Sequence, residues 1–113
     1  MKQLQAWRQG KLLIATVWLA EDAGERMRGL LGRAPLASGE AMLITPCRMV
    51  HTFGMAYALD LAFVDRHGQI RKLVRQLPPA RMAGCLRAYA TLEMPAGEIE
   101  RLGLQPGDTI DWQ

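Results

Sequence analysis

YALDLAFVDRHGQIRKLVRQL, residues 57–77, decides the fold class of this chain. Its first part, Tyr57 to Val64, is rich in large apolar residues and predicts a core β-strand. Asp65-Arg66-His67-Gly68 has the composition of a hairpin turn. The return from Gln69 to Leu77 has no clean inside face, and its basic residues favour an edge strand that resists further pairing. The stretch therefore predicts a hairpin in a β-rich domain.

Strand-like segments continue on both sides of this hairpin. They are Leu12 to Leu19, Met42 to Thr45, the run Met49 to Val64, Ala88 to Met94 with Leu92 and Met94 inward, and Thr109 to Trp112. Two short helices are expected, one within residues 21–33 and one from Pro95 to Leu102 capped by Gly103. The pattern predicts a mainly β fold, a compact antiparallel β-sandwich or partly closed barrel with two short helices. A βαβ fold is disfavoured, because neither helix is long enough for a crossover.

The chain has 113 residues, which matches the size of one domain spanning residues 1–113. Half of its residues are hydrophobic and 22% are charged, an ordinary globular composition. Lys2, Arg8 and Lys11 precede an apolar run that ends at Ala20 and superficially resembles a secretory signal. Because the run is too short to span a bilayer and Trp18 lies three residues before a cut after Ala20, we interpret it as a buried first strand.

Cysteine content and charge narrow the class of protein further. Cys47 and Cys85 are too few for a disulfide scaffold and form no Cys-x-x-Cys pair, so we expect reduced thiols in a cytoplasmic protein. The net charge is only +3, but the stretch 66–87 carries six basic residues and no acid. The stretch contains no aromatic residue on which a base could stack. We therefore interpret it as a solvated basic face rather than a nucleic-acid site.

Several ordered motifs carry a resemblance to a known family. They are Arg26-Met27-Arg28-Gly29-Leu30-Leu31-Gly32-Arg33, Val50-His51-Thr52-Phe53-Gly54-Met55 with Asp60, Leu92-Glu93-Met94-Pro95-Ala96-Gly97, and Gly107-Asp108. With these motifs the chain resembles the domain-of-unknown-function 192 family from about Leu12 to Trp112. The resemblance implies a compact, jelly-roll-like β-sandwich of bacteria and archaea with no established activity.

The resemblance also has limits. Many relatives are exported or membrane-anchored, whereas this chain looks like a cytoplasmic version. Ala56 and Ala58 stand where relatives often carry a basic residue and a proline, which puts any ligand contact by that basic residue in doubt. Since fold does not determine function, the site must be argued from its residues.

The candidate ligand-binding residues are polar or soft side chains in apolar surroundings: His51, Thr52, Met55, Asp60 and Glu93. A titratable group in such a setting is a candidate for a site. For Asp60 and Glu93 the structural alternative is a carboxylate that accepts backbone N–H groups, and we expect that outcome for both. His51 is expected to be the one of the three titratable groups most open to solvent, and its own alternative is a hydrogen-bonded core imidazole.

Two more reactive uses of these residues are weaker. Cys47, His51 and Met55 are four residues apart, and together they offer the ligands that copper(I) prefers, but no fourth ligand is evident and we expect no metal or other cofactor. A catalytic use would make Cys47 or Thr52 a nucleophile, His51 its base, and Asp60 or Glu93 the orienting group. The arginines at 26, 28 and 33 could bind an anion, although such arginines more often solvate a helix.

The leading expectation is a monomeric, non-enzymatic module that binds a small molecule or a protein partner through His51, Thr52, Met55, Asp60 and Glu93. The alternative is a small hydrolase or thiol-dependent enzyme that uses Cys47 and His51. Weak nucleic-acid binding through residues 66–87 comes third, and no membrane interaction is expected.

Overall fold

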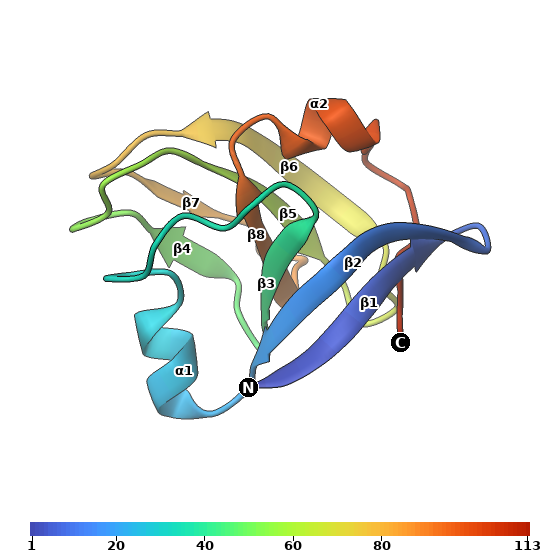
Figure 1. The fold of residues 1–113 in the computed structure, drawn as a ribbon, viewed down its shortest axis with the longest axis horizontal. Helices are drawn as coiled ribbons and strands as arrows, with labels where there is room; N and C mark the ends of the chain where they lie inside the picture. Colours follow the sequence, from blue (N-terminus) through green and yellow to red (C-terminus); the bar gives the residue numbers. More distant parts are fainter.

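The computed structural model describes residues 1–113, and most of its regular structure is β-strand (Figure 1). The nine strands are β1 (Lys2–Arg8), β2 (Lys11–Ala20), β3 (Glu40–Ile44), β4 (Met49–His51), β5 (Leu59–Val64), β6 (Ile70–Leu77), β7 (Met82–Gly84), β8 (Ala90–Pro95) and β9 (Asp111–Trp112). The two helices are α1 (Ala23–Arg28) and α2 (Glu98–Leu102). The predicted mainly β fold with two short helices is confirmed.

Seven strands form one mixed sheet in the order β6-β5-β8-β3-β2-β1-β9, and β4 pairs with β7 in a separate small sheet. The large sheet curls, as Figure 1 shows. Its end strand β6 is joined to the segment before β9 by backbone hydrogen bonds, among them Ile70 N to Asp108 O and Ile110 N to Gly68 O, both 2.8 Å. These bonds draw the two ends together, which gives the partly closed barrel expected from the sequence.

Gly68 is required at this junction. Its φ of +80° lies in the left-handed region, and a Cβ there would come within 2.2 Å of Ile110 O. The turn at Asp65–Gly68 therefore both reverses the hairpin of β5 and β6 and allows the close approach of the C-terminal segment.

Two hydrophobic clusters lie on opposite faces of the large sheet. Residues of one parity, such as Ala62 and Leu92, pack with Ile99 of α2, whereas residues of the other parity, such as Leu61 and Met42, pack with side chains of β4 and of the segment after α1. Strands β5 and β8 are therefore buried on both faces. This explains why Tyr57 to Val64 reads as a nearly continuous apolar run rather than as an alternating one.

The segment between β2 and β3 corrects one prediction. These two strands are parallel neighbours, so residues 21–39 form a crossover, although the sequence disfavoured one. Most of that connection is irregular chain, and its helix has only six residues. A short helix does not prevent a crossover, because the whole connection has to be long enough to return the chain to the start of the parallel strand. A capping box between Asp22 and Glu25 starts α1, and Gly29 ends it.

Other boundaries also differ from the sequence prediction. Strand β1 was not predicted, and it pairs with β2. The apolar run after Lys11 is therefore a strand, as expected, but it is the second strand and not the first, and it is buried only in part. The run Met49 to Val64 is two strands in different sheets, separated by turns after His51. β6 lies at the edge of the sheet as expected, and Gly103 caps α2 in the left-handed conformation.

Candidate functional site

A cavity of about 80 Å³ opens beside the crossover, between the end of α1 and the small sheet. Its walls are residues 26–31 of the crossover, Ile44 of β3, several side chains between Cys47 and Leu59, and Glu93 of β8. Ten of the fifteen lining residues are hydrophobic. The chemistry of this pocket therefore depends on its few polar groups.

Glu93 is the buried polar group of the pocket. In the sheet its Cα lies opposite Met42 on one side and Leu61 on the other, so its side chain emerges from an apolar row. The residue is only 4% exposed, and Oε1 has no hydrogen-bond partner. Burial raises the pKa of Glu93 from its ordinary value of 4.5 to about 7. Its carboxyl is thus an acceptor that the fold leaves unused.

Gly29 covers this carboxyl from the crossover side. The position of a Cβ at Gly29 would be 3.4 Å from Oε1 of Glu93 and 3.4 Å from Cδ1 of Ile44. Its backbone has φ 49° and ψ −125°, a conformation that only glycine adopts readily. The glycine in the Arg-Gly-Leu-Leu-Gly-Arg sequence therefore lets the chain turn tightly onto Glu93.

Three arginines surround the crossover and donate to backbone carbonyls. Arg26 donates from Nε to Glu21 O at 3.2 Å and from Nη1 to Pro46 O at 3.4 Å. Arg28 donates to Leu31 O at 3.2 Å, and Arg33 donates to Gly29 O at 2.9 Å. None of the three forms an ion pair with a carboxylate. Arg26 and Arg28 line the pocket, so its rim is positively charged.

The structure brings Cys47, His51 and Met55 to the same pocket, in line with their spacing of four. The thiol of Cys47 donates to Met49 O at 3.3 Å rather than to His51. His51 is exposed, and its ring lies 5.6 Å from that of Phe53. No group of three His, Cys, Asp or Glu side chains is close enough together to hold a metal ion. Cys47 and Cys85 are both free thiols.

Thr52 belongs to the framework and not to the pocket wall. Its side chain is fully buried, donates to Pro78 O at 2.7 Å and accepts from the N–H of Arg81 at 2.9 Å. These bonds fasten the end of β4 to the loop before β7. Thr52 is therefore separated from His51 and Met55, with which we had grouped it.

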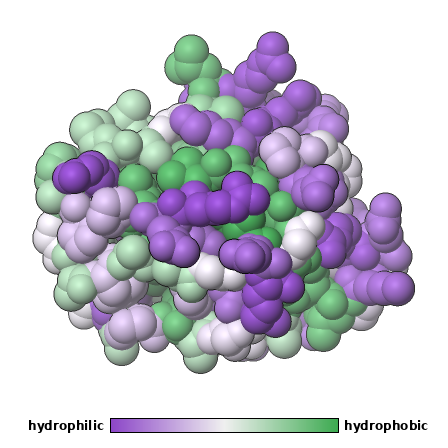
Figure 2. All heavy atoms as spheres, turned by 90° about the horizontal axis from the view of Figure 1, so that it is seen from above, coloured by the Kyte–Doolittle hydropathy of each residue, from purple (hydrophilic) through white to green (hydrophobic).

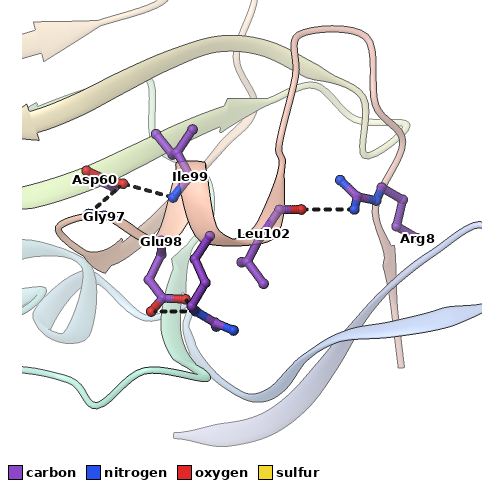
Figure 3. Close-up of polar contacts among 7 residues, drawn as sticks. Arg8, Asp60, Gly97, Glu98, Ile99 and Leu102 are labelled. Carbon is purple, nitrogen blue, oxygen red and sulfur yellow. Dashed lines mark hydrogen bonds and ion pairs between the residues drawn. The ribbon is translucent and has the colours of Figure 1, made fainter.

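Asp60 lies on the other face of the large sheet. Its Oδ2 accepts from the N–H groups of Gly97 and Ile99 at 3.0 and 2.9 Å (Figure 3), and its Oδ1 accepts from Gln76 N at 2.8 Å. Asp60 thus holds the first turn of α2 and the irregular end of β6. The expected structural environment exists for Asp60, whereas for Glu93 the expected backbone donors are absent and that expectation is wrong.

Two features of the sites were not predicted from the sequence. One is the role of Gly29, whose signal was a glycine inside a predicted helix. The other is Glu98, which is buried and bonded to Arg101 (Figure 3). Burial alone would raise the pKa of Glu98, but hydrogen bonds led by that from Arg101 hold it below its ordinary value. The carboxylate of Glu98 is therefore paired with a cation, whereas the carboxyl of Glu93 has no partner.

Of the basic side chains in the stretch 66–87, those of Arg66, Arg71 and Lys72 have partners within the fold. Arg71 pairs with Asp65 at 2.8 Å, and the Arg66 guanidinium lies 4.8 Å from the centre of the Tyr89 ring. Lys72 donates to Gly84 O at 2.8 Å. Figure 2, which looks down on the face of Figure 1 that carries β6 and α2, shows hydrophilic side chains interleaved with apolar ones. No helix of the structure is long and apolar enough to cross a membrane.

Comparison with known proteins places the chain among uncharacterised relatives. A UPF0127 protein of Thermococcus sibiricus is 28% identical over 110 residues, which cover 93% of this chain and 71% of the relative. A protein of unknown function from Novosphingobium aromaticivorans has the same fold, with a TM-score of 0.84 and 22% identity over 97% of this chain and 84% of its own.

A second solved structure, described as a proposed transcription regulator of Sinorhizobium meliloti 1021, has a TM-score of 0.83 and 26% identity. It is matched over 97% of this chain and 92% of its own. The family model of DUF192, whose members are described as Uncharacterized ACR, matches residues 5–112. Because that match spans almost the whole chain and agrees with the motifs and the fold, this protein belongs to the DUF192 family of uncharacterised proteins.

Proposed function

We propose that this protein is a single-domain, non-enzymatic module that binds a small ligand in the pocket beside α1. The observation that carries the proposal is the unpartnered Oε1 of Glu93 at the base of that pocket. A buried acceptor without a donor is rare in folded proteins and destabilises the fold. A ligand that donates an N–H or O–H group to Oε1 would remove this penalty. Its affinity is increased because the free protein already holds the unpaired acceptor in the pocket.

The size and walls of the pocket support this function. Its volume of about 80 Å³ is small, so one end of a ligand enters it and the remainder lies over the rim. The side chains of Leu30, Ile44 and Leu59 supply apolar walls for that end. Of the candidate residues, His51, Met55 and Glu93 line this site, whereas Thr52 and Asp60 support the elements around it.

A thiol-dependent enzyme is the less supported alternative. It requires that Cys47 transfer its proton to His51, and the thiol proton instead points to the carbonyl of Met49. The nucleic-acid alternative has in its favour the description of one structural relative. Against it, residues 66–87 contain no aromatic residue on which a base could stack, and Arg71 is already paired with Asp65. A cytoplasmic location, which free thiols favour, is part of the proposal.

The experiment that tests the proposal is a fragment screen by protein-observed NMR. Small amines, primary amides and alcohols are added to the wild-type protein and to Glu93→Leu, which removes the acceptor and fills the space with an apolar group. Glu100→Gln, which removes an exposed carboxylate of α2, is the matched control. We expect fragments that shift resonances around the pocket in the wild type and the control but not in Glu93→Leu. Fragments that bind Glu93→Leu equally well, or no binding by any of them, would refute the proposal.

A further inference from the structure

A second cavity, of about 290 Å³, adjoins the pocket of Glu93 on the outer side of the crossover. Five of its eight lining residues also line the first pocket: Arg26, Met27, Ile44, Cys47 and Met49. Because the two cavities share five lining residues, we treat them as the inner and outer parts of one groove. The inner part is narrow and ends at Glu93, and the outer part is wider.

The charged groups of this groove differ along its length: Glu93 lines only the inner part, Arg48 lines only the outer part, and Arg26 lines both. The inner end carries the carboxyl of Glu93. The outer part is lined by Arg26 and Arg48, which approach it from α1 and from the segment before β4. Arg48 donates from Nε to Ala88 O at 3.1 Å, and Arg26 bonds only to backbone carbonyls. Neither guanidinium pairs with a carboxylate of the protein, so both have N–H donors free to meet an anion.

The wall between the two ends is apolar and adaptable. Met27 and Met49 are 84% and 60% exposed, although large apolar side chains of this kind are usually buried. Their thioethers lie along the groove with Ile44. Methionine side chains are flexible and fit ligands of different shape, as they do at other binding surfaces. A short alkyl chain would cover these side chains and remove them from water.

We propose that the groove binds a bipolar ligand of the ω-amino acid class, with its amine on the Glu93 carboxyl, its alkyl chain along Met27 and Met49, and its carboxylate on Arg26 and Arg48. This inference rests on the proposed function, because it uses the same Oε1 as the inner contact. It adds the chemistry of the outer end: the anionic group is recognised by two guanidiniums, which bind carboxylates through paired hydrogen bonds.

The test uses ω-amino acids and alkylamines of matched chain length. The wild-type protein is titrated by NMR with 4-aminobutanoate, 5-aminopentanoate and 6-aminohexanoate, and with butylamine, pentylamine and hexylamine. For the amino acid of best length we expect an affinity about tenfold or more above that of the matched amine, since a charged hydrogen bond contributes about 1.4 kcal/mol or more. The double variant Arg26→Gln, Arg48→Gln should bind that amino acid no better than the amine. The control Arg87→Gln, an exposed arginine outside the groove, should behave as the wild type.

The outcomes separate this inference from the proposed function. If the amines bind as tightly as the amino acids, and binding is lost in Glu93→Leu, the outer site is refuted and the function at Glu93 stands. If the double variant retains the tenfold preference, the arginines are not the carboxylate site and the inference is refuted. If no amine or amino acid binds while other donors in the fragment screen do so through Glu93, the ligand class is wrong. If nothing binds through Glu93, the proposed function itself is refuted.

Discussion

The Cβ position of Gly29 lies 3.4 Å from Oε1 of Glu93, so the chain leaving α1 rests directly on a carboxyl that has no hydrogen-bond donor. The two residues are far apart in the sequence and meet because the crossover returns over β3 and β8. The contact excludes water from one side of the carboxyl and leaves the other side facing the pocket. Oε1 of Glu93 is the one buried side-chain oxygen or nitrogen of the structure without a hydrogen-bond partner, and the proposed ligand site rests on this atom.

The stability of the protein should fall as the pH rises from about 5 to 8. The folded pKa of Glu93, about 7, lies above its ordinary value of 4.5, so in this interval the folded state binds more protons than the unfolded state. The full loss should be about 3 kcal/mol of unfolding free energy, since one pKa unit corresponds to 1.36 kcal/mol. Urea denaturation at pH 5 and pH 8 measures it, with Glu93→Gln as the variant that lacks the titrating group. A slope that persists unchanged in Glu93→Gln would assign the effect to other groups.

Asp60 and Glu93 should respond oppositely to substitution. Asp60→Ala leaves three backbone N–H groups without their acceptor and should lower the unfolding free energy by about 1 to 3 kcal/mol. Glu93→Leu removes an acceptor that has no donor and should maintain or raise stability at pH 8. Chemical denaturation of both variants at the same pH makes the comparison. A large loss in Glu93→Leu would mean that its carboxyl has donors in solution.

Gly29→Ala should destabilise the fold and narrow the pocket. The backbone at Gly29 is strained for any other residue, and the new methyl group would contact Glu93 and Ile44. The expected loss is about 1 to 3 kcal/mol. Gly32→Ala is the matched control, because Gly32 also has a positive φ but has no atom within 4 Å of its Cβ position. If both variants lose the same stability, the contact with Glu93 has no separate effect.

Thr52→Val should destabilise without altering binding in the pocket. Valine has the shape of threonine but cannot accept from Arg81 N or donate to Pro78 O, so a loss of about 1 to 3 kcal/mol is expected. Thr52→Ser keeps the hydroxyl and should lose less. Thermal unfolding and the fragment titration together provide the check. A stable Thr52→Val variant that no longer bound the fragments would instead place Thr52 in the ligand site.

Nucleic-acid binding should be absent or weak and non-specific. Specific binding through several phosphates would be tight at low salt and fall steeply as the salt concentration rises. A mobility-shift assay at low salt with a mixed duplex tests this, using Arg71→Ala, Lys72→Ala, Arg75→Ala as a triple variant. A micromolar shift abolished by the triple variant would contradict the expectation and would favour the nucleic-acid alternative.

Local patterns were sufficient for most of the fold. The apolar run before Asp65, the turn that ends at Gly68 and the basic return strand predict the hairpin of β5 and β6, because strand and turn preferences act between neighbouring residues. Gly103 correctly predicts where α2 ends, whereas the predicted start at Pro95 is wrong, because Pro95 ends β8 and α2 begins at Glu98. The parallel pairing of β2 with β3 was not predicted. It depends on where the mostly irregular segment between the two strands brings the chain back to the sheet.

The candidate site depended on tertiary structure to a greater degree. From the sequence, Asp60 and Glu93 are alike, each a lone carboxylate in an apolar strand. In the sheet Asp60 lies opposite Met94 and Glu93 lies opposite Leu61, so the two carboxylates project from opposite faces. One face carries the N–H groups of α2, which satisfy Asp60, and the other carries the crossover, which offers Glu93 no donor. The sequence by itself determined that both carboxylates stand in otherwise largely apolar strands, and it predicted backbone donors for each. Only the pairing register and the elements packed on each face decided which one is satisfied, because hydrogen bonding to a side chain depends on groups brought near it by distant parts of the chain.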